Sequence, residues 1–172
     1  MGGRVTQRSA GLVASVVATL VALSGVAAAG SSVEDYAGFT EMATTADYVV
    51  MVNVLPAERM FSIGENERLH PTVGELVIEG VGARARPWAR HVEAHVYSRA
   101  TGEVLTDVVP AIEVLDRKTG RVIPVAPVLM QDVVIGVPDR HFGNNVIVRP
   151  DRTITVVVRI GDQVVSVDGR IA

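Results

Sequence analysis

The sequence predicts an all-β protein folded as an antiparallel β-sandwich. Short runs rich in valine and isoleucine alternate with polar residues, as half-buried strands do. Glycine, proline and asparagine separate these runs at short intervals, which is typical of sandwich folds. No stretch after residue 29 keeps a helical period. Only 4% of the residues are aromatic, so we expect a core of valine, isoleucine and leucine.

The expected strands follow one another along the second and larger part of the chain. Two long runs flank residues 116–120, which end in Gly120 and predict a hairpin turn. Prolines interrupt both runs, which suits edge strands or bulges. Residues 62–74 are expected to form a loop, and residues 141–145 a tight polar segment. The strands are expected at residues 48–55, 75–81, 90–97, 104–115, 121–130, 146–148, 153–160 and 164–167.

The first 29 residues have the pattern of a secretory signal peptide. Arg4 and Arg8 precede an apolar run at 10–26, and three alanines at 27–29 supply a small-residue cleavage pattern. A retained membrane anchor is the alternative, but the run is short for a span of about 20 apolar residues. We therefore expect a cleaved helical signal peptide at 1–29, a flexible lead-in at 30–46 and one β-sandwich domain at 47–172, in the periplasm or elsewhere outside the cytoplasm.

Charge and cysteine content exclude several classes of function. Without the expected signal peptide, 14 basic residues remain of the 16, against 19 acidic ones, so the formal charge is −5. A net negative domain argues against nucleic acid as a partner. The chain has no cysteine, so it has no disulfides and no thiolate for a blue-copper site. The core alone must stabilise the domain.

The strand expected at 90–97 carries the residues most suited to chemistry. Strand periodicity places His91, Glu93 and His95 on one face and small apolar residues on the other. Neighbours on one face lie about 6.5–7 Å apart, close enough for two of them to share a metal ion. The alternative is a polar face in contact with water, which is usual in antiparallel sheets. The residue pattern alone favours this solvated face.

Four segments together resemble a known family, the periplasmic iron-transport accessory proteins. These are small cupredoxin-like β-sandwiches that bind copper and function with a ferrous-iron permease. The segments occur in the same order as in that family and cover most of residues 48–160. They are the strand with its Pro-x-Glu stretch at 49–60, the His-Val-Glu-Ala strand at 91–94, the proline-containing strand and hairpin at 109–120, and the Asp-Arg-His-Phe-Gly-Asn-Asn segment at 139–145.

The resemblance implies a copper site formed by His91, Glu93, Met130 and His141. Imidazole suits Cu(II), thioether suits Cu(I), and carboxylate adds charge compensation. The chain departs from the family in three ways. No histidine follows His141, the spacing from Met130 to His141 is longer, and His95 stands where the family usually has aspartate. His95 then either replaces the missing imidazole or faces water. The resemblance also implies a homodimer.

We therefore expect an exported metal-binding protein that captures copper or iron for uptake through a membrane permease. The alternative is an immunoglobulin-like structural or adhesion module without a metal. An enzyme is not expected, because the chain has no Gly-x-Ser-x-Gly elbow and no His-Glu-x-x-His motif. Its four histidines are too few for a copper-zinc dismutase site.

Overall fold

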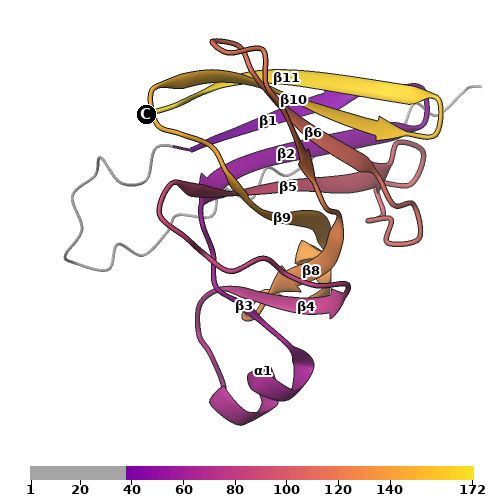
Figure 1. The fold of residues 1–172 in the computed structure, drawn as a ribbon. Helices are drawn as coiled ribbons and strands as arrows, with labels where there is room; N and C mark the ends of the chain where they lie inside the picture. The colour runs from indigo at the N-terminus through magenta and orange to yellow at the C-terminus, as the bar shows by residue number, and fades with distance from the viewer. Residues whose placement is uncertain (1–37) are drawn as a thin grey trace, which may run out of the picture. The chain divides into compact units, whose positions relative to one another are not determined.

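A computed structural model describes residues 38–172 and confirms an all-β fold of two sheets (Figure 1). The predicted signal peptide and the beginning of the lead-in lie outside the described residues. Within residues 38–172, no helix is long and apolar enough to cross a membrane. The elements are β1 (Phe39–Thr44), β2 (Tyr48–Pro56), β3 (Met60–Phe61), α1 (Ile63–Leu69), β4 (Glu75–Glu79), β5 (Ala89–Ser98), β6 (Ala111–Asp116), β7 (Val122–Val125), β8 (Val128–Asp132), a 3₁₀ turn (Val137–Asp139), β9 (His141–Ile147), β10 (Arg152–Ile160) and β11 (Gln163–Ile171).

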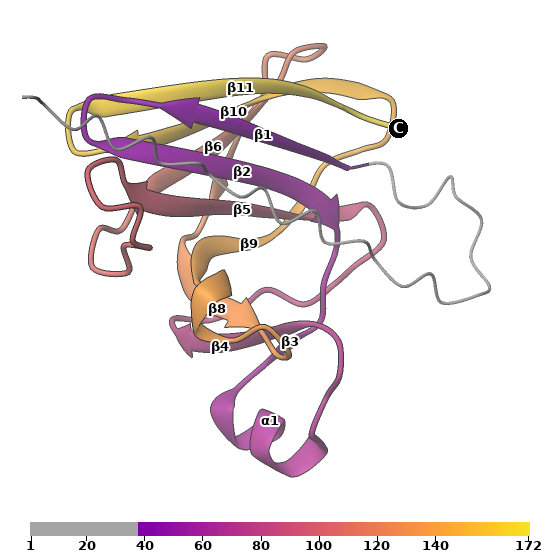
Figure 2. The same cartoon turned by 180° about the vertical axis from the view of Figure 1, so that it is seen from behind.

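The two sheets pack face to face at one end of the domain (Figures 1 and 2). The larger sheet has the strand order β1-β2-β5-β9-β8-β4-β3, and the smaller one has the order β11-β10-β6-β7. All pairs are antiparallel except the two-residue pairing of β3 with β4, which is parallel. The structure thus confirms the β-sandwich. The closer likeness to cupredoxin or immunoglobulin folds stays a prediction.

The core between the sheets is made of valine and isoleucine, as the scarcity of aromatic residues predicted. Alternate residues of each strand point inward, so a two-residue period places the apolar side chains in this layer. One face of β2 and β5 packs against β6, β10 and β11. The fully buried members of this layer are Val50, Val52, Val54, Val92, Ala94, Val96, Val114, Ile154, Val156 and Ile171.

The far end of the larger sheet coils away from the sandwich, as Figure 1 shows for β9, β8, β4 and β3. Strand β4 lies three positions from β5 in the sheet order. In a flat sheet this separation would be about 14 Å. Ligand atoms of Glu75 on β4 and His91 on β5 nevertheless lie within 4.8 Å of each other. A register shift between Val77 and Glu79 marks a bulge in β4, and bulges increase local twist.

Three predicted boundaries were wrong in the first half of the domain. The expected lead-in contains β1, because Phe39 and Ala43 pack against the core. The expected loop at 62–74 contains α1, which begins at a capping box formed by Ser62 and Glu65. Its seven residues are too few to show a helical period in the sequence. The expected strand at 104–115 begins only at Ala111, after the proline that interrupted it.

Two further segments differ from the prediction and shape the site. The expected strand at 121–130 is two strands in different sheets. β7 pairs with β6, and β8 pairs with β9. Pro127 removes a backbone donor where the chain passes between the sheets, and Pro124 lies in the short strand β7. The expected polar segment at 141–145 is part of β9, which lies between β5 and β8 near the middle of the larger sheet.

Candidate metal centre

Strand β5 places His91, Glu93 and His95 on one face, as the alternation predicted, but this face is not in water. The three residues are 0%, 5% and 2% exposed. The coiled end of the larger sheet covers them, with β4 and β8 beneath β9 in Figure 1. The solvated-face interpretation is therefore wrong. Because burying polar groups without partners costs several kcal/mol, these side chains need a specific compensation.

Strand β9 brings the fourth predicted residue, His141, to this face. The His141 ring lies 4.8 Å from the His95 ring and 5.7 Å from the His91 ring, measured between centroids. Its Nε2 atom is 3.2 Å from Oε2 of Glu93. The close pairing of β9 with β5 depends on Gly143, which stands opposite Glu93. A Cβ at this position would lie 2.5 Å from a backbone oxygen of β5, so a larger residue would separate the two strands.

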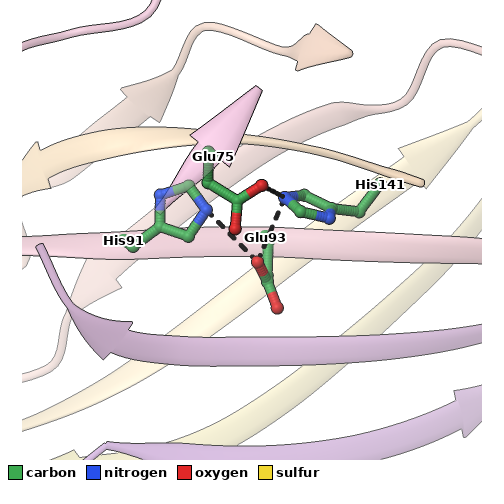
Figure 3. A group of neighbouring side chains, drawn as sticks. All are labelled: Glu75, His91, Glu93 and His141. Atoms are coloured by element: carbon green, nitrogen blue, oxygen red, sulfur yellow. Dashed lines mark ion pairs between the residues drawn. The ribbon is translucent and has the colours of Figure 1, made fainter. Parts of the chain in front are cut away.

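Strand β4 contributes Glu75, which the sequence did not single out. Its Oε2 atom lies 3.6 Å from His141 Nε2, and the residue is 3% exposed. On the opposite side, His91 Nε2 lies 3.2 Å from Glu93 Oε2. Figure 3 shows these two imidazoles and two carboxylates converging from β4, β5 and β9. We call this group the buried cluster: Glu75, His91, Glu93 and His141, whose ligand atoms all lie within 4.8 Å of one another.

Neighbouring groups fix the orientation of the cluster side chains. The backbone carbonyl of Asp139 accepts a hydrogen bond from His141 Nδ1 at 2.8 Å. This bond directs Nε2 toward the carboxylates, and metal-ligating histidines use the same arrangement. Asn53 on β2 donates a hydrogen bond to Oε1 of Glu93, so Oε2 is left for the cluster. The cluster is therefore held in place by residues outside it.

Several atoms of the cluster have no hydrogen-bond partner among residues 38–172. They are both ring nitrogens of His91, Nε2 of His141 and Oε2 of Glu75. The Nε2 atoms of His91 and His141 each lie 3.2 Å from Oε2 of Glu93, and Oε2 of Glu75 lies 3.6 Å from His141 Nε2. Buried polar groups are almost always paired, so such a group requires an explanation. Two imidazoles and two carboxylates whose ligand atoms converge in this way have the geometry of a cation site.

The pKa values show how the cluster carries its charge without a metal. Burial lowers the pKa of His141, but the hydrogen bonds to Asp139 and the charges of Glu93 and Glu75 raise it to about 9. Burial also raises the pKa of Glu75 to about 9, although His141 opposes this. Burial acts in the same direction on Glu93, but the nearby imidazoles outweigh it and hold this pKa well below the usual range. In the metal-free protein, the protons on His141 and Glu75 therefore offset the negative charge that a bound divalent cation would neutralise.

The structure places the other two predicted ligands beside the cluster. His95 approaches Oε1 of Glu93 at 3.2 Å, and its ring stacks on Tyr97. It forms a second group with Asp139 and His141, whose ligand atoms also lie within 4.8 Å of one another. Met130 is fully buried and pairs directly with His141 across β8 and β9, so both side chains are on the same face. Both residues are neighbours of the four-membered cluster.

No protein-family model, curated protein or solved structure matches this chain. The family resemblance therefore stays a prediction from the motifs, and the site is judged on its own geometry. The one histidine outside the site, His70, ends α1 in a left-handed conformation and is exposed, as expected for an ordinary loop residue.

Proposed function

We propose that this protein is an exported metal-binding protein that captures a copper or iron ion for uptake into the cell. The observation that carries this proposal is the buried cluster. It holds two imidazoles and two carboxylates, and within the described residues buried polar atoms of His91, His141 and Glu75 lack hydrogen-bond partners. A divalent ion would neutralise the carboxylates and accept the free lone pairs of both imidazoles.

The donor set limits the choice of metal. Imidazole suits copper, iron, zinc and nickel, whereas carboxylate favours harder ions. Two of each favour Fe(II) or Cu(II) over a soft ion such as Cu(I). Met130 and His95 stand next to the cluster and would add a thioether and a third imidazole if the ion were reduced copper. The motif resemblance favours copper within this range.

The enclosure of the cluster favours binding over catalysis. Its four residues are at most 5% exposed. A catalytic metal needs an open position that a substrate can reach. A structural or adhesion module is the second candidate, but such a module has no use for buried carboxylates and imidazoles, which cost stability when they are unpaired.

The proposals of export and of delivery to a permease rest on the sequence. The signal-like pattern of residues 1–29 favours a protein that works outside the cytoplasm. The motif resemblance adds a membrane permease as the receiver of the ion, and a homodimer as the working form. An ion held without an open coordination position must leave through movement of a ligand, which suits a protein that transfers its cargo to another.

Thermal unfolding of the metal-stripped protein, with and without Cu(II) or Fe(II), tests the proposal. An ion that binds only the folded state at 100 times its Kd adds about 2.7 kcal/mol and raises the Tm. Glu93→Gln keeps the shape of the side chain but removes its charge, and should abolish the rise. Glu41→Gln, on the exposed side of β1, is the matched control and should keep it. No rise with either metal would favour the structural module.

A further inference from the structure

An ion cannot reach the buried cluster without a route, because its members are almost completely covered. Within residues 38–172, the partly exposed acids near it are Glu58, Asp139 and Asp132, which pairs with Glu75 across β4 and β8. The carboxyl of Asp132 already accepts hydrogen bonds from two backbone N–H groups that follow it in the chain. Asp139 is already engaged. Its Oδ2 atom accepts a hydrogen bond from the backbone N–H of Asp132 at 2.8 Å and lies 3.4 Å from His141 Nδ1. Asp139 therefore positions His141. Glu58 is the partly exposed acid whose carboxyl remains available to an arriving ion.

Glu58 lines a cavity of about 470 Å³ beside the end of β2 and the start of β4. Gly74 lines the same cavity and directly precedes Glu75. Leu55 also lines it, and pairs with His91 across β2 and β5. Two lining residues are therefore direct neighbours of cluster members, one along the chain and one across the sheet. Its lining consists of Leu55, Pro56, Ala57, Glu58, Arg59, Val73 and Gly74.

The backbone of Glu58 is held in place from within the larger sheet. The side chain of Asn145 on β9 accepts a hydrogen bond from the Glu58 N–H at 3.1 Å and donates one to its carbonyl at 2.7 Å. Asn145 itself pairs with His91 across β5 and β9. Burial raises the pKa of the Glu58 carboxyl, while the charge of His91 and the neighbouring Glu75 side chain lower it, so this carboxyl lies near the cluster. It thus joins the cavity wall to the cluster.

We propose that this cavity is the route by which the metal ion reaches the buried cluster, with Glu58 capturing the ion and passing it to Glu75. This inference rests on the proposed function. The ion exchanges water for the Glu58 carboxylate at the cavity wall, then exchanges that carboxylate for Glu75 and the two imidazoles. Glu58 returns to its place, so it speeds binding and release without belonging to the final ligand set.

Stopped-flow mixing of the metal-stripped full chain with Cu(II) tests the route, with quenching of tyrosine and tryptophan fluorescence as the signal. Tyr97 stacks on His95 and reports from beside the site. Glu58→Gln should slow association about tenfold or more, the lower range for loss of a focusing charge. Dissociation into excess chelator should slow by the same factor, so that Kd stays unchanged.

Two more variants separate the route from general effects of charge. Val73→Trp keeps every charge and narrows the cavity at a residue that is 75% exposed, so it should slow association and leave the fold intact. Glu79→Gln removes an equal charge from the exposed end of β4 and should change neither rate.

The outcomes are distinct. Unchanged association in both Glu58→Gln and Val73→Trp overturns the route. Faster dissociation with unchanged association makes Glu58 a permanent ligand and also overturns it. If the unchanged protein binds neither Cu(II) nor Fe(II) at equilibrium, the proposed function itself fails, and the route fails with it.

Discussion

The metal-free protein is expected to lose stability as the pH rises from about 6 to about 9. The perturbation acts on His141, whose pKa rises from 6.5 to about 9 on folding because of Asp139, Glu93 and Glu75. The folded state then binds the proton more tightly than the unfolded state. This contribution is fully present below pH 6.5 and is lost as the pH rises through about 9.

The size of the effect follows from the same shift. Each pKa unit corresponds to 1.36 kcal/mol, so the change for His141 is worth about 3 kcal/mol. Glu75 acts in the same direction, since burial raises its pKa from 4.5 to about 9. The two groups touch and titrate together, so their effects are not summed. Glu93 has the opposite sign. Its lowered pKa stabilises the fold above pH 4.5, and this contribution is lost on acidification.

Urea unfolding at pH 6, 7.5 and 9, followed by fluorescence, measures how the free energy of unfolding changes with pH. A loss of about 3 kcal/mol is large against a total of about 5–15 kcal/mol. His141→Gln should flatten the slope, because the titrating group is gone. The metal-loaded protein should show the reverse trend, because protons compete with the ion and metal binding strengthens as the pH rises. Stability that is constant or increases between pH 6 and 9 in the metal-free protein would refute the reasoning.

Two further substitutions probe the scaffold. Gly143→Ala should destabilise the protein by about 1–3 kcal/mol and weaken metal binding, because the new Cβ would lie 2.5 Å from the Val92 carbonyl oxygen. Gly64→Ala is the control, because a Cβ at Gly64 meets nothing within 4 Å. Equal urea midpoints for the two variants would contradict the predicted loss of stability. Ser62→Ala should remove the capping box of α1 and cost about 1 kcal/mol without changing metal affinity. A change in the metal affinity of this variant, measured by titration with the metal ion, would instead link α1 to the site.

Local patterns in the sequence were sufficient for the class of fold and for part of the site. The alternation of residues 90–97 correctly grouped His91, Glu93 and His95, because a two-residue period is a property of the single strand. His141 was singled out by its motif, although its segment was expected to be a tight polar segment. The sequence did not identify this segment as a strand, because its glycine and asparagines are typical turn residues.

Glu75 shows what the sequence could not provide. It begins an ordinary alternating strand, and nothing in its neighbours distinguishes it from a surface glutamate. Its role depends on the coiling of the larger sheet, which brings β4 over β5 across three strand positions. The position of Glu58 depends on two hydrogen bonds with Asn145, which is 87 residues away in the chain: Asn145 accepts one from the Glu58 N–H and donates one to the Glu58 carbonyl.

The sequence by itself determined the class of fold, most of the strands with their apolar faces, and the chemical types of the candidate ligands, because these follow from side-chain periodicity and composition. Only the tertiary structure decided that the polar face of β5 is buried and which carboxylates meet the imidazoles there. The physical reason is that burial and ligand convergence depend on how strands far apart in the chain twist over one another, and sheet coiling is set by packing of the whole domain.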